Sequence, residues 1–153
     1  MNKIESFHGE YRFLSNFWPC RIEFEGQVFP TTEHAYQAGK TFSKKEREQF
    51  TTVVAPVLTA GQAKTAGAKV TLRPDWRHIN IDLMRELNFQ KFSTNPELKE
   101  KLLATGDAVL EEGNTWGDTF WGICNGAGEN WLGKVLMEVR EELRGEENVR
   151  QQN

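Results

Sequence analysis

The sequence predicts an α+β fold, dominated by helices and carrying a small sheet, in a single domain. Apolar residues recur at helical spacing along much of the chain, and the short strand candidates do not alternate regularly with the helices. A doubly wound sheet requires that alternation, so it is not expected here. The chain has 153 residues, of which 38% are hydrophobic and 27% are charged. These values are typical of one globular domain and exclude a disordered or fibrous chain.

The first predicted element is a hairpin. Residues 21–29 alternate polar and apolar side chains around a Glu25-Gly26 turn. This pattern predicts a short antiparallel pair whose inward side chains are Ile22, Phe24 and Val28.

A helix is expected to follow the hairpin directly. Pro30 ends the second strand, and Thr31 or Thr32 can cap the helix that follows. We expect this helix to begin at about Glu33 and to run past Lys40.

Three further helices are predicted in the middle of the chain. Residues 59–70 are rich in Ala, Gln and Lys, and residues 76–92 place apolar side chains at helical spacing. Residues 94–97 match a capping box with an early proline, and Gly106 is expected to stop the helix that the box begins.

The last elements are a short strand, a long helix and a tail. Val109-Leu110 is the strand candidate. The final helix carries an apolar stripe of Leu132, Val135, Leu136, Val139 and Leu143. Residues 146–153 carry one apolar side chain, too few to offset the entropy of ordering them. We therefore expect a domain over residues 1–145 and a disordered polar tail over residues 146–153.

Charge and cysteine content narrow the classes of function. The net charge of −3 argues against general nucleic-acid binding, although residues 40–77 hold eight Lys or Arg and only three Asp or Glu. That basic segment either faces a phosphorylated small molecule or is a solvated helical face. No stretch reaches the roughly 18 apolar residues of a membrane span, and no apolar signal core is present. Two cysteines far apart, Cys20 and Cys124, are typical of free thiols, so we expect a cytoplasmic protein.

The predicted helix after the hairpin carries polar groups on one face. Glu33, Gln37 and Lys40 stand one above another on a helix, and Tyr36 flanks them. The opposite side carries the small residues Ala35, Ala38 and Gly39, which allow a neighbouring element to approach closely. The alternative interpretation is an ordinary stripe exposed to solvent.

Histidine and cysteine do not form a metal-binding pattern. His34 lies off the polar stripe, and a single His is more often a hydrogen-bonded structural residue than a ligand. No His, Cys and Asp cluster has the spacing of a metal site. We expect neither a metal nor a cofactor.

A second polar cluster lies in the glycine-rich segment 110–130. Glu112 and Asp118 supply acids, while Trp116 and Trp121 offer flat faces on which a ring can stack. Tryptophans that only fill a core are the alternative. The segment leads through Asn130 into the last helix, whose N-terminus can receive a phosphate. Its spacing matches neither of the common nucleotide-binding glycine motifs.

Five sequence pieces in one order resemble a known family. They are Phe13-Leu14-Ser15-Asn16-Phe17, the segment 30–40, Arg73-Pro74-Asp75-Trp76, the segment 116–122 and the segment 130–140. Together, over about residues 6–143, they resemble the NADAR (YbiA-like) family, which is named for its association with NAD and ADP-ribose. Known members are N-glycosidases. One branch cleaves ribosylamine intermediates of the riboflavin pathway, and another removes ADP-ribose from guanine.

The resemblance implies hydrolysis of a C–N bond to a ribose phosphate, either in a ribosylaminopyrimidine phosphate or in ADP-ribosylated guanine, free or in nucleic acid. Such a reaction builds positive charge on the sugar, which nearby carboxylates stabilise. A partly buried lysine can lose its proton and attack C1′, forming a Schiff base with the opened sugar. The resemblance favours Lys40 in this role.

The other site residues follow as hypotheses. Glu33 or Glu112 would move the proton, and Asp118 would orient a hydroxyl group or water. Phosphate or base edges would be held by Arg12, Asn16 and Arg73, because an arginine fork donates two hydrogen bonds at once. The remaining residues expected at the substrate are Phe17, Tyr36, Gln37, Trp76, Asn114, Trp116, Trp121 and Asn130.

Two questions stay open at the level of sequence. In the riboflavin-type branch a short Ala-Ser-Pro-like turn follows the acid, whereas here Gly113-Asn114-Thr115 follows it. This difference leaves the substrate branch open, and also the choice between Glu111 and Glu112, although Glu112 fits the pattern better. A module that binds ADP-ribose-like ligands without turning them over is the alternative function, and a structural partner protein is a third.

Overall fold

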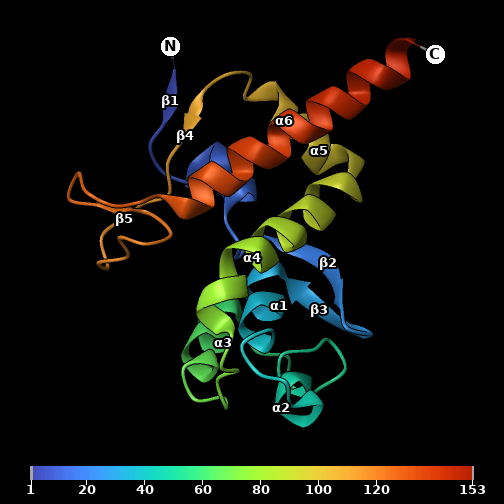
Figure 1. Cartoon of the computed structure of the whole chain (residues 1–153), viewed down its shortest axis with the longest axis vertical. Helices are drawn as coiled ribbons and strands as arrows, with labels where there is room; N and C mark the ends of the chain where they lie inside the picture. The colour runs from blue at the N-terminus through green and yellow to red at the C-terminus, as the bar shows by residue number, and fades with distance from the viewer. Residues whose placement is uncertain (1, 153) are drawn as a thin grey trace. The chain divides into compact units, whose positions relative to one another are not determined.

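The structure is a computed structural model, which describes residues 2–152, and it confirms the helix-dominated α+β class (Figure 1). A 3₁₀ helix covers Gly9–Leu14. The α-helices are α1 (Thr32–Ala38), α2 (Lys44–Glu48), α3 (Ala60–Gly67), α4 (Trp76–Ser93), α5 (Pro96–Ala104) and α6 (Trp131–Gln152). The strands are β1 (Lys3–Ile4), β2 (Pro19–Phe24), β3 (Gln27–Thr31), β4 (Val109–Leu110), β5 (Gly113–Asn114) and β6 (Ile123–Cys124). Within residues 2–152, no helix is both long and apolar enough to cross a membrane.

The strands pair into separate small sheets. β1 pairs in parallel with β4, β2 pairs antiparallel with β3, and β5 pairs in parallel with β6. The part of the chain that the structure describes therefore holds three two-stranded sheets, where the sequence predicted a single small one.

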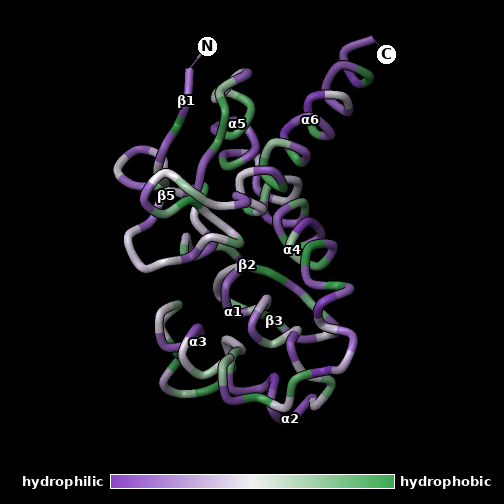
Figure 2. Tube along the Cα trace, turned by 60° about the vertical axis from the view of Figure 1, so that its left-hand side comes forward, coloured by the Kyte–Doolittle hydropathy of each residue, from purple (hydrophilic) through white to green (hydrophobic). Residues whose placement is uncertain are grey.

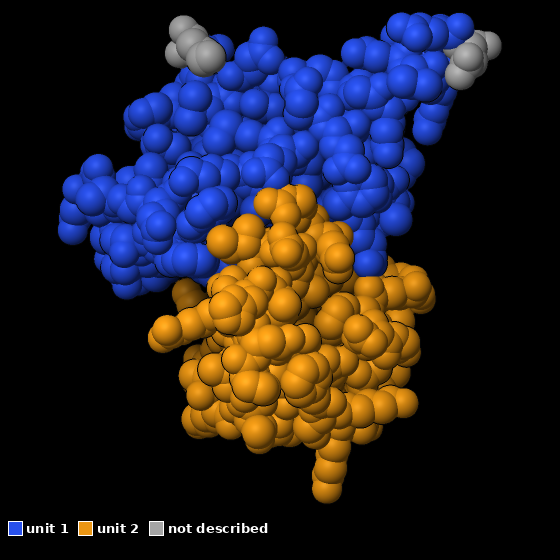
Figure 3. Space-filling view, viewed as in Figure 1, with its two compact units in different colours: residues 1–15, 88–153 blue, residues 16–87 orange. Residues whose placement is uncertain are grey.

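The chain forms two compact units, drawn in different colours in Figure 3. One unit comprises residues 16–87, and the other comprises residues 1–15 and 88–153. We call them the α1 unit and the α6 unit. Each has buried side chains of its own, among them Ile22 and Phe29 in the α1 unit and Leu110 and Leu136 in the α6 unit.

The predicted hairpin is present, with one face assigned differently. The turn at Glu25-Gly26 has positive φ angles of 50° and 80°, as a tight two-residue connection requires. Ile22 pairs with Phe29, and both side chains are fully buried. Phe24 and Val28 are only half-buried, so the sequence placed the wrong residue of β3 inward. Alternation alone did not distinguish Val28 from Phe29, because both neighbouring positions are apolar.

The helix after the hairpin is capped as expected but ends early. The Thr31 hydroxyl oxygen accepts a hydrogen bond from His34 N over 3.1 Å. α1 ends at Ala38 with Gly39 as its C-cap, so the prediction that the helix runs past Lys40 is wrong. A side chain at Gly39 would lie 2.5 Å from Leu83 Cδ2, which shows how closely α4 approaches this end of α1.

The capping box predicted at residues 94–97 does not form, and a capping box is found at another helix. α5 begins after Asn95, which makes no side-chain cap, and Pro96 occupies the first turn. The complete box belongs to α3, where Thr59 accepts from Gln62 N and the Gln62 side chain accepts from Thr59 N.

The final helix carries the stripe that the sequence predicts. All five apolar side chains of the stripe are buried. Arg140, also on the buried side of α6, donates to the carbonyl oxygen of Ala108 over 2.9 Å. α6 continues through the predicted tail to Gln152, so residues 146–152 have helical backbone. Most side chains there are exposed, and Figure 2 colours these last turns mainly as hydrophilic.

The hairpin assignment gives a stability test. Phe29→Ala should lower the free energy of unfolding by about 3–5 kcal/mol, because it removes a fully buried ring. Val28→Ala, at a half-buried position, should cost roughly 1 kcal/mol or less. Urea denaturation of both variants measures the difference, and equal losses would contradict the assignment of Phe29 to the inner face.

Candidate active site

The polar face of α1 is buried. Glu33 and Gln37 expose only 8% and 4% of their surfaces. Gln37 Nε2 donates a hydrogen bond to Glu33 Oε2 over 2.9 Å. The alternative of a stripe exposed to solvent is therefore wrong for these two residues.

Lys40 lies just beyond this face. It directly follows the C-cap glycine of α1 and is half-buried. Its Nζ atom lies 6.0 Å from the centre of the Tyr36 ring. Its backbone is held on both sides, because Lys40 N donates to Gln37 O over 3.2 Å and Lys40 O accepts from Arg73 N over 2.7 Å. The lysine therefore extends from a fixed point of the backbone.

Burial lowers the pKa of the Lys40 ammonium group below its ordinary value. The negative charge of Glu33 acts in the opposite direction, and the positive charge of Lys64 adds to the lowering. A lowered pKa increases the fraction of neutral amine near neutral pH, and the neutral amine is the nucleophilic form.

The Tyr36 ring near Lys40 packs against a second aromatic ring, that of Trp76. Tyr36 and Trp76 are both buried, and their ring centres are 5.0 Å apart. Tyr36 comes from α1 and Trp76 from the first turn of α4. Both rings were expected at the substrate, and the structure brings Tyr36 close to the lysine.

Arg73 is held by a carboxylate of its own loop. Its Nε and Nη2 atoms donate to Asp75 Oδ1 and Oδ2 over 2.6 and 2.9 Å. These hydrogen bonds raise the pKa of Arg73 and lower that of Asp75. The guanidinium carbon also lies 4.2 Å from the centre of the Phe42 ring, which is 62% exposed. Arg73 is thus fixed in place, and its contact with a phosphate stays a prediction.

Asn16 supports the start of α1. Its carbonyl oxygen accepts a hydrogen bond from Glu33 N over 3.1 Å, and its Nδ2 donates to Met84 Sδ over 3.4 Å. The neighbouring Phe17 is 44% exposed. Arg12 belongs to the other unit, where it lies exposed on the 3₁₀ helix. The roles of these residues at a substrate stay predictions.

The α6 unit gathers the residues of the glycine-rich segment around Glu112. Asn130 Oδ1 accepts from Glu112 N over 3.0 Å, and Asn130 Nδ2 donates to Leu110 O over 2.9 Å. Asn114 Nδ2 donates to Glu112 Oε2 over 3.2 Å. A side chain at Gly122 would overlap the Glu112 carboxylate. Both asparagines therefore contact Glu112 and help to place it.

Asp118 organises its own turn. Its Oδ1 atom accepts hydrogen bonds from Phe120 N over 3.1 Å and from Trp121 N over 2.9 Å. Its backbone N–H donates to Asn114 Oδ1 over 3.1 Å. These contacts show that Asp118 stabilises the turn. Its part in the reaction stays a prediction.

Neither tryptophan of this segment is a core residue. Trp116 is 56% exposed. Trp121 is half-buried, and its ring meets that of Phe120 edge to face with centres 4.9 Å apart. The interpretation of both rings as core filling is wrong, and stacking on a substrate stays a prediction.

Glu111 and Glu112 have different surroundings. Glu111 forms an ion pair with Lys3 at 3.4 Å. Glu112 forms hydrogen bonds with Asn130 and Asn114. The choice between the two acids, for which the sequence pattern favours Glu112, stays a prediction.

The structure also draws attention to two residues that the sequence analysis did not single out. A side chain at Gly67 would overlap Gln37 Oε1. Phe42 follows Lys40 by two positions in the sequence, and its ring is exposed. Phe42 carries a weak sequence signal as an aromatic residue close to the lysine. Gly67 carries none, because its importance depends on a helix that is distant in sequence.

His34 has the structural role expected of it. Its Nδ1 lies 2.7 Å from Thr31 Oγ1, and its Nε2 lies 2.7 Å from Leu58 O. Among residues 2–152, no group of three or more His, Cys, Asp or Glu side chains is arranged to hold a metal ion.

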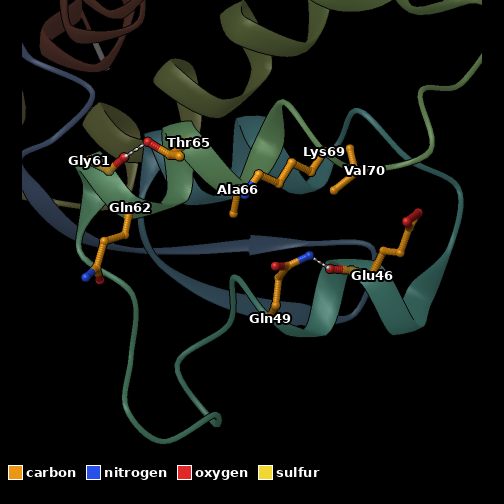
Figure 4. A pocket seen from close by; sticks show the side chains of 8 residues that line it. All are labelled: Glu46, Gln49, Gly61, Gln62, Thr65, Ala66, Lys69 and Val70. Atoms are coloured by element: carbon orange, nitrogen blue, oxygen red, sulfur yellow. Dashed lines mark hydrogen bonds between the residues drawn. The ribbon is translucent and has the colours of Figure 1, made fainter.

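A cavity of about 470 Å³ lies between α2 and α3 (Figure 4). Its lining mixes polar and apolar surface and contains none of the predicted site residues. The residues that form it are Glu46, Gln49, Gly61, Gln62, Thr65, Ala66, Lys69 and Val70. Several of their polar groups already bond within the protein, as Glu46 does with Thr41 and Thr71. This cavity is distinct from the predicted site.

Comparisons with known proteins agree with the resemblance. The NADAR domain model matches residues 5–144. N-glycosidase YbiA of Escherichia coli K12 is 37% identical over 137 residues, which cover 88% of this chain and 82% of the relative. An N-glycosidase of Nostoc punctiforme is 41% identical, with 88% and 86% covered. A riboflavin biosynthesis protein of Vibrio vulnificus is 40% identical over 86% of this chain and 35% of its own length.

A solved structure is also similar. The NMR structure of the E. coli protein YbiA matches with a TM-score of 0.80 and 34% sequence identity. The match covers 95% of this chain and 85% of that one.

The lowered pKa of Lys40 can be measured by amine labelling. Because the neutral amine reacts, Lys40 should be acylated at a lower pH than the exposed Lys69, which serves as an internal reference. Glu33→Gln removes a charge that raises the pKa, so it should move the labelling of Lys40 to still lower pH. Mass spectrometry maps the label. Equal pH midpoints for both lysines would contradict this description of Lys40.

Proposed function

Since the chain belongs to the NADAR family and is an N-glycosidase, we propose that it hydrolyses the C–N bond between a base or amine and a phosphorylated ribose, with Lys40 as the nucleophile. The observation that carries the role of Lys40 is its position. It is half-buried beside Tyr36, it follows the buried Glu33–Gln37 pair, and its pKa is lowered by burial.

The first half of the reaction opens the sugar. The neutral amine of Lys40 attacks C1′ and forms a C–N bond. The bond from C1′ to O4′ breaks as the ribose ring opens, and O4′ takes a proton that the attacking nitrogen gives up. The bond from C1′ to the base breaks, and the departing nitrogen takes a proton from an acid. The product is a Schiff base between Lys40 and the opened ribose phosphate, together with the free base.

The second half restores the enzyme. Water adds to C1′ of the Schiff base, the bond to Nζ breaks, and the sugar aldehyde leaves. A carboxylate takes a proton from this water and so returns to the acid form that the next cycle needs. The charge that develops at C1′ is favoured by nearby carboxylates.

Glu33 and Glu112 are the two candidates for this proton transfer. Glu33 belongs to the same unit as Lys40 and lies close enough to influence its pKa. Glu112 belongs to the α6 unit and is fixed there by two asparagines. Asp118 and its loop would contribute to holding the substrate. The kinetics of variants of each acid distinguish these roles.

The substrate is a phosphorylated ribosyl compound of one of two kinds. The names of the relatives, N-glycosidase and riboflavin biosynthesis protein, favour ribosylaminopyrimidine phosphates of the riboflavin pathway. The loop after Glu112 departs from that branch, and this observation keeps ADP-ribosylated guanine as the second candidate.

A product screen by mass spectrometry decides between them. The panel holds riboflavin intermediates, NAD, ADP-ribose, and ADP-ribosylated guanosine and DNA. Release of a free base or amine identifies the substrate. Binding without any product from the panel would favour the alternative of a module that only binds its ligand.

Removal of the nucleophile should abolish turnover. Lys40→Ala should lower kcat by about 1000-fold or more, because the covalent route is lost. Borohydride should trap an adduct on Lys40 in the wild type and none in the variant. Lys69→Ala, which removes an exposed lysine, serves as control. Nearly full turnover of Lys40→Ala, or an adduct mapped to another lysine, would refute the assignment.

The two neighbouring acids should behave differently. Glu112→Gln should lower the rate by about 100-fold or more if Glu112 transfers the proton. Glu111→Gln, which breaks the ion pair with Lys3, should change it little. Steady-state kinetics of both variants measure the contrast. A loss smaller than about threefold in Glu112→Gln would assign the proton transfer elsewhere, with Glu33 as the next candidate.

A further inference from the structure

The side-chain amide of Gln37 forms a hydrogen bond through its nitrogen, whereas its oxygen forms none among the described residues. Its Nε2 donates to Glu33 Oε2 over 2.9 Å. Its Oε1 is buried and accepts no hydrogen bond among the described residues, in a residue that exposes only 4% of its surface. Turning the amide over would place Oε1 against the Glu33 carboxylate, where two acceptors repel each other. Hydrogen bonding therefore holds only one end of this amide.

Packing against α3 holds the other end. Gly67 is the last residue of α3 and is buried. A side chain there would overlap Gln37 Oε1 and lie 2.6 Å from Gln37 Cδ and 3.0 Å from Gln37 Cβ. The Gln37 side chain thus lies directly on the backbone of Gly67, with no space left for a methyl group.

A second glycine of the same helix provides a comparison. At Gly61 an added Cβ would meet nothing within 4 Å, and the residue is exposed. α3 therefore holds one glycine that a side chain can replace without contact and one that it cannot. The lack of space at Gly67 is therefore caused by its contact with Gln37, and it is not a general property of α3.

We propose that Gly67 is a positioning residue for the reaction: its bare backbone holds the Gln37 amide against Glu33 and so keeps the Glu33 carboxylate beside Lys40. The amide has no second hydrogen bond with which to hold itself, so the shape of the surface at Gly67 sets its orientation. The catalytic part of this inference rests on the proposed function, whereas the contact itself does not.

The contact is tested without any substrate. The side-chain amide resonance of Gln37 in a ¹⁵N-labelled protein reports on its hydrogen bond to Glu33. Gly67→Ala should shift this resonance, and Gly61→Ala should leave it unchanged. An unchanged resonance in a folded Gly67→Ala protein would overturn the proposal, whatever the enzyme turns over.

The catalytic consequence is tested by a double-mutant cycle. Gly67→Ala and Gln37→Ala should each lower kcat by about 10- to 100-fold, because the carboxylate loses its fixed position. The matched control Gly61→Ala should keep the wild-type kcat. In the Gln37→Ala background the overlaps with Oε1 and Cδ are gone and only the 3.0 Å approach to Cβ remains, so adding Gly67→Ala should cause little further loss. Additive losses would show that Gly67 acts through folding alone and would overturn the proposal.

Two further outcomes are also decisive. If Gly67→Ala does not fold, Gln37→Ala and the double variant still compare the two positions, because the shortened side chain at residue 37 leaves more room for a methyl group at residue 67. A Gln37→Ala protein with wild-type kcat would overturn the proposal. If the wild type turns over no compound of the panel, the proposed function fails, and the Gln37 resonance alone still decides whether Gly67 holds the amide.

Discussion

The burial of polar groups along α1 is the constraint on which this part of the structure depends. Buried polar groups are costly unless hydrogen bonds satisfy them. Thr31 and His34 meet this requirement at the start of the helix, through the cap and through the bond to Leu58 O. Glu33 and the Nε2 atom of Gln37 meet it through each other, whereas Gln37 Oε1 accepts no hydrogen bond among the described residues. The small residues Ala35 and Ala38, both fully buried, let neighbouring elements come close enough to cover the helix.

The early end of α1 determines how Lys40 is presented. A helix that continued past residue 40 would carry the lysine on the same stripe as Glu33 and Gln37. Instead, the chain leaves the helix at Gly39, and Lys40 O accepts a hydrogen bond from Arg73 N. Arg73 is in turn fixed by Asp75. The backbone of the lysine is thus anchored from two elements, while its side chain extends past Tyr36 and is only half-buried.

The sequence could predict what depends on local pattern. The Thr31 cap, the Glu25-Gly26 turn and the buried stripe of α6 all follow from residue types at short spacing, and the structure confirms them. It could not predict that Phe29 rather than Val28 faces inward, because two adjacent apolar residues fit either register. Gly67 lay beyond sequence reasoning for a different reason. Its effect arises where α3 meets α1, 30 positions away from Gln37 along the chain.

Burial alone does not make a lysine a nucleophile, and Lys91 shows why. Lys91 is fully buried, and its Nζ donates a hydrogen bond to Ser15 O over 2.9 Å. Full burial denies a substrate access to this amine. Lys40 differs from Lys91 in its exposure. Burial lowers the pKa of Lys40, and its side chain is only half-buried, as the proposed attack on C1′ of a sugar requires.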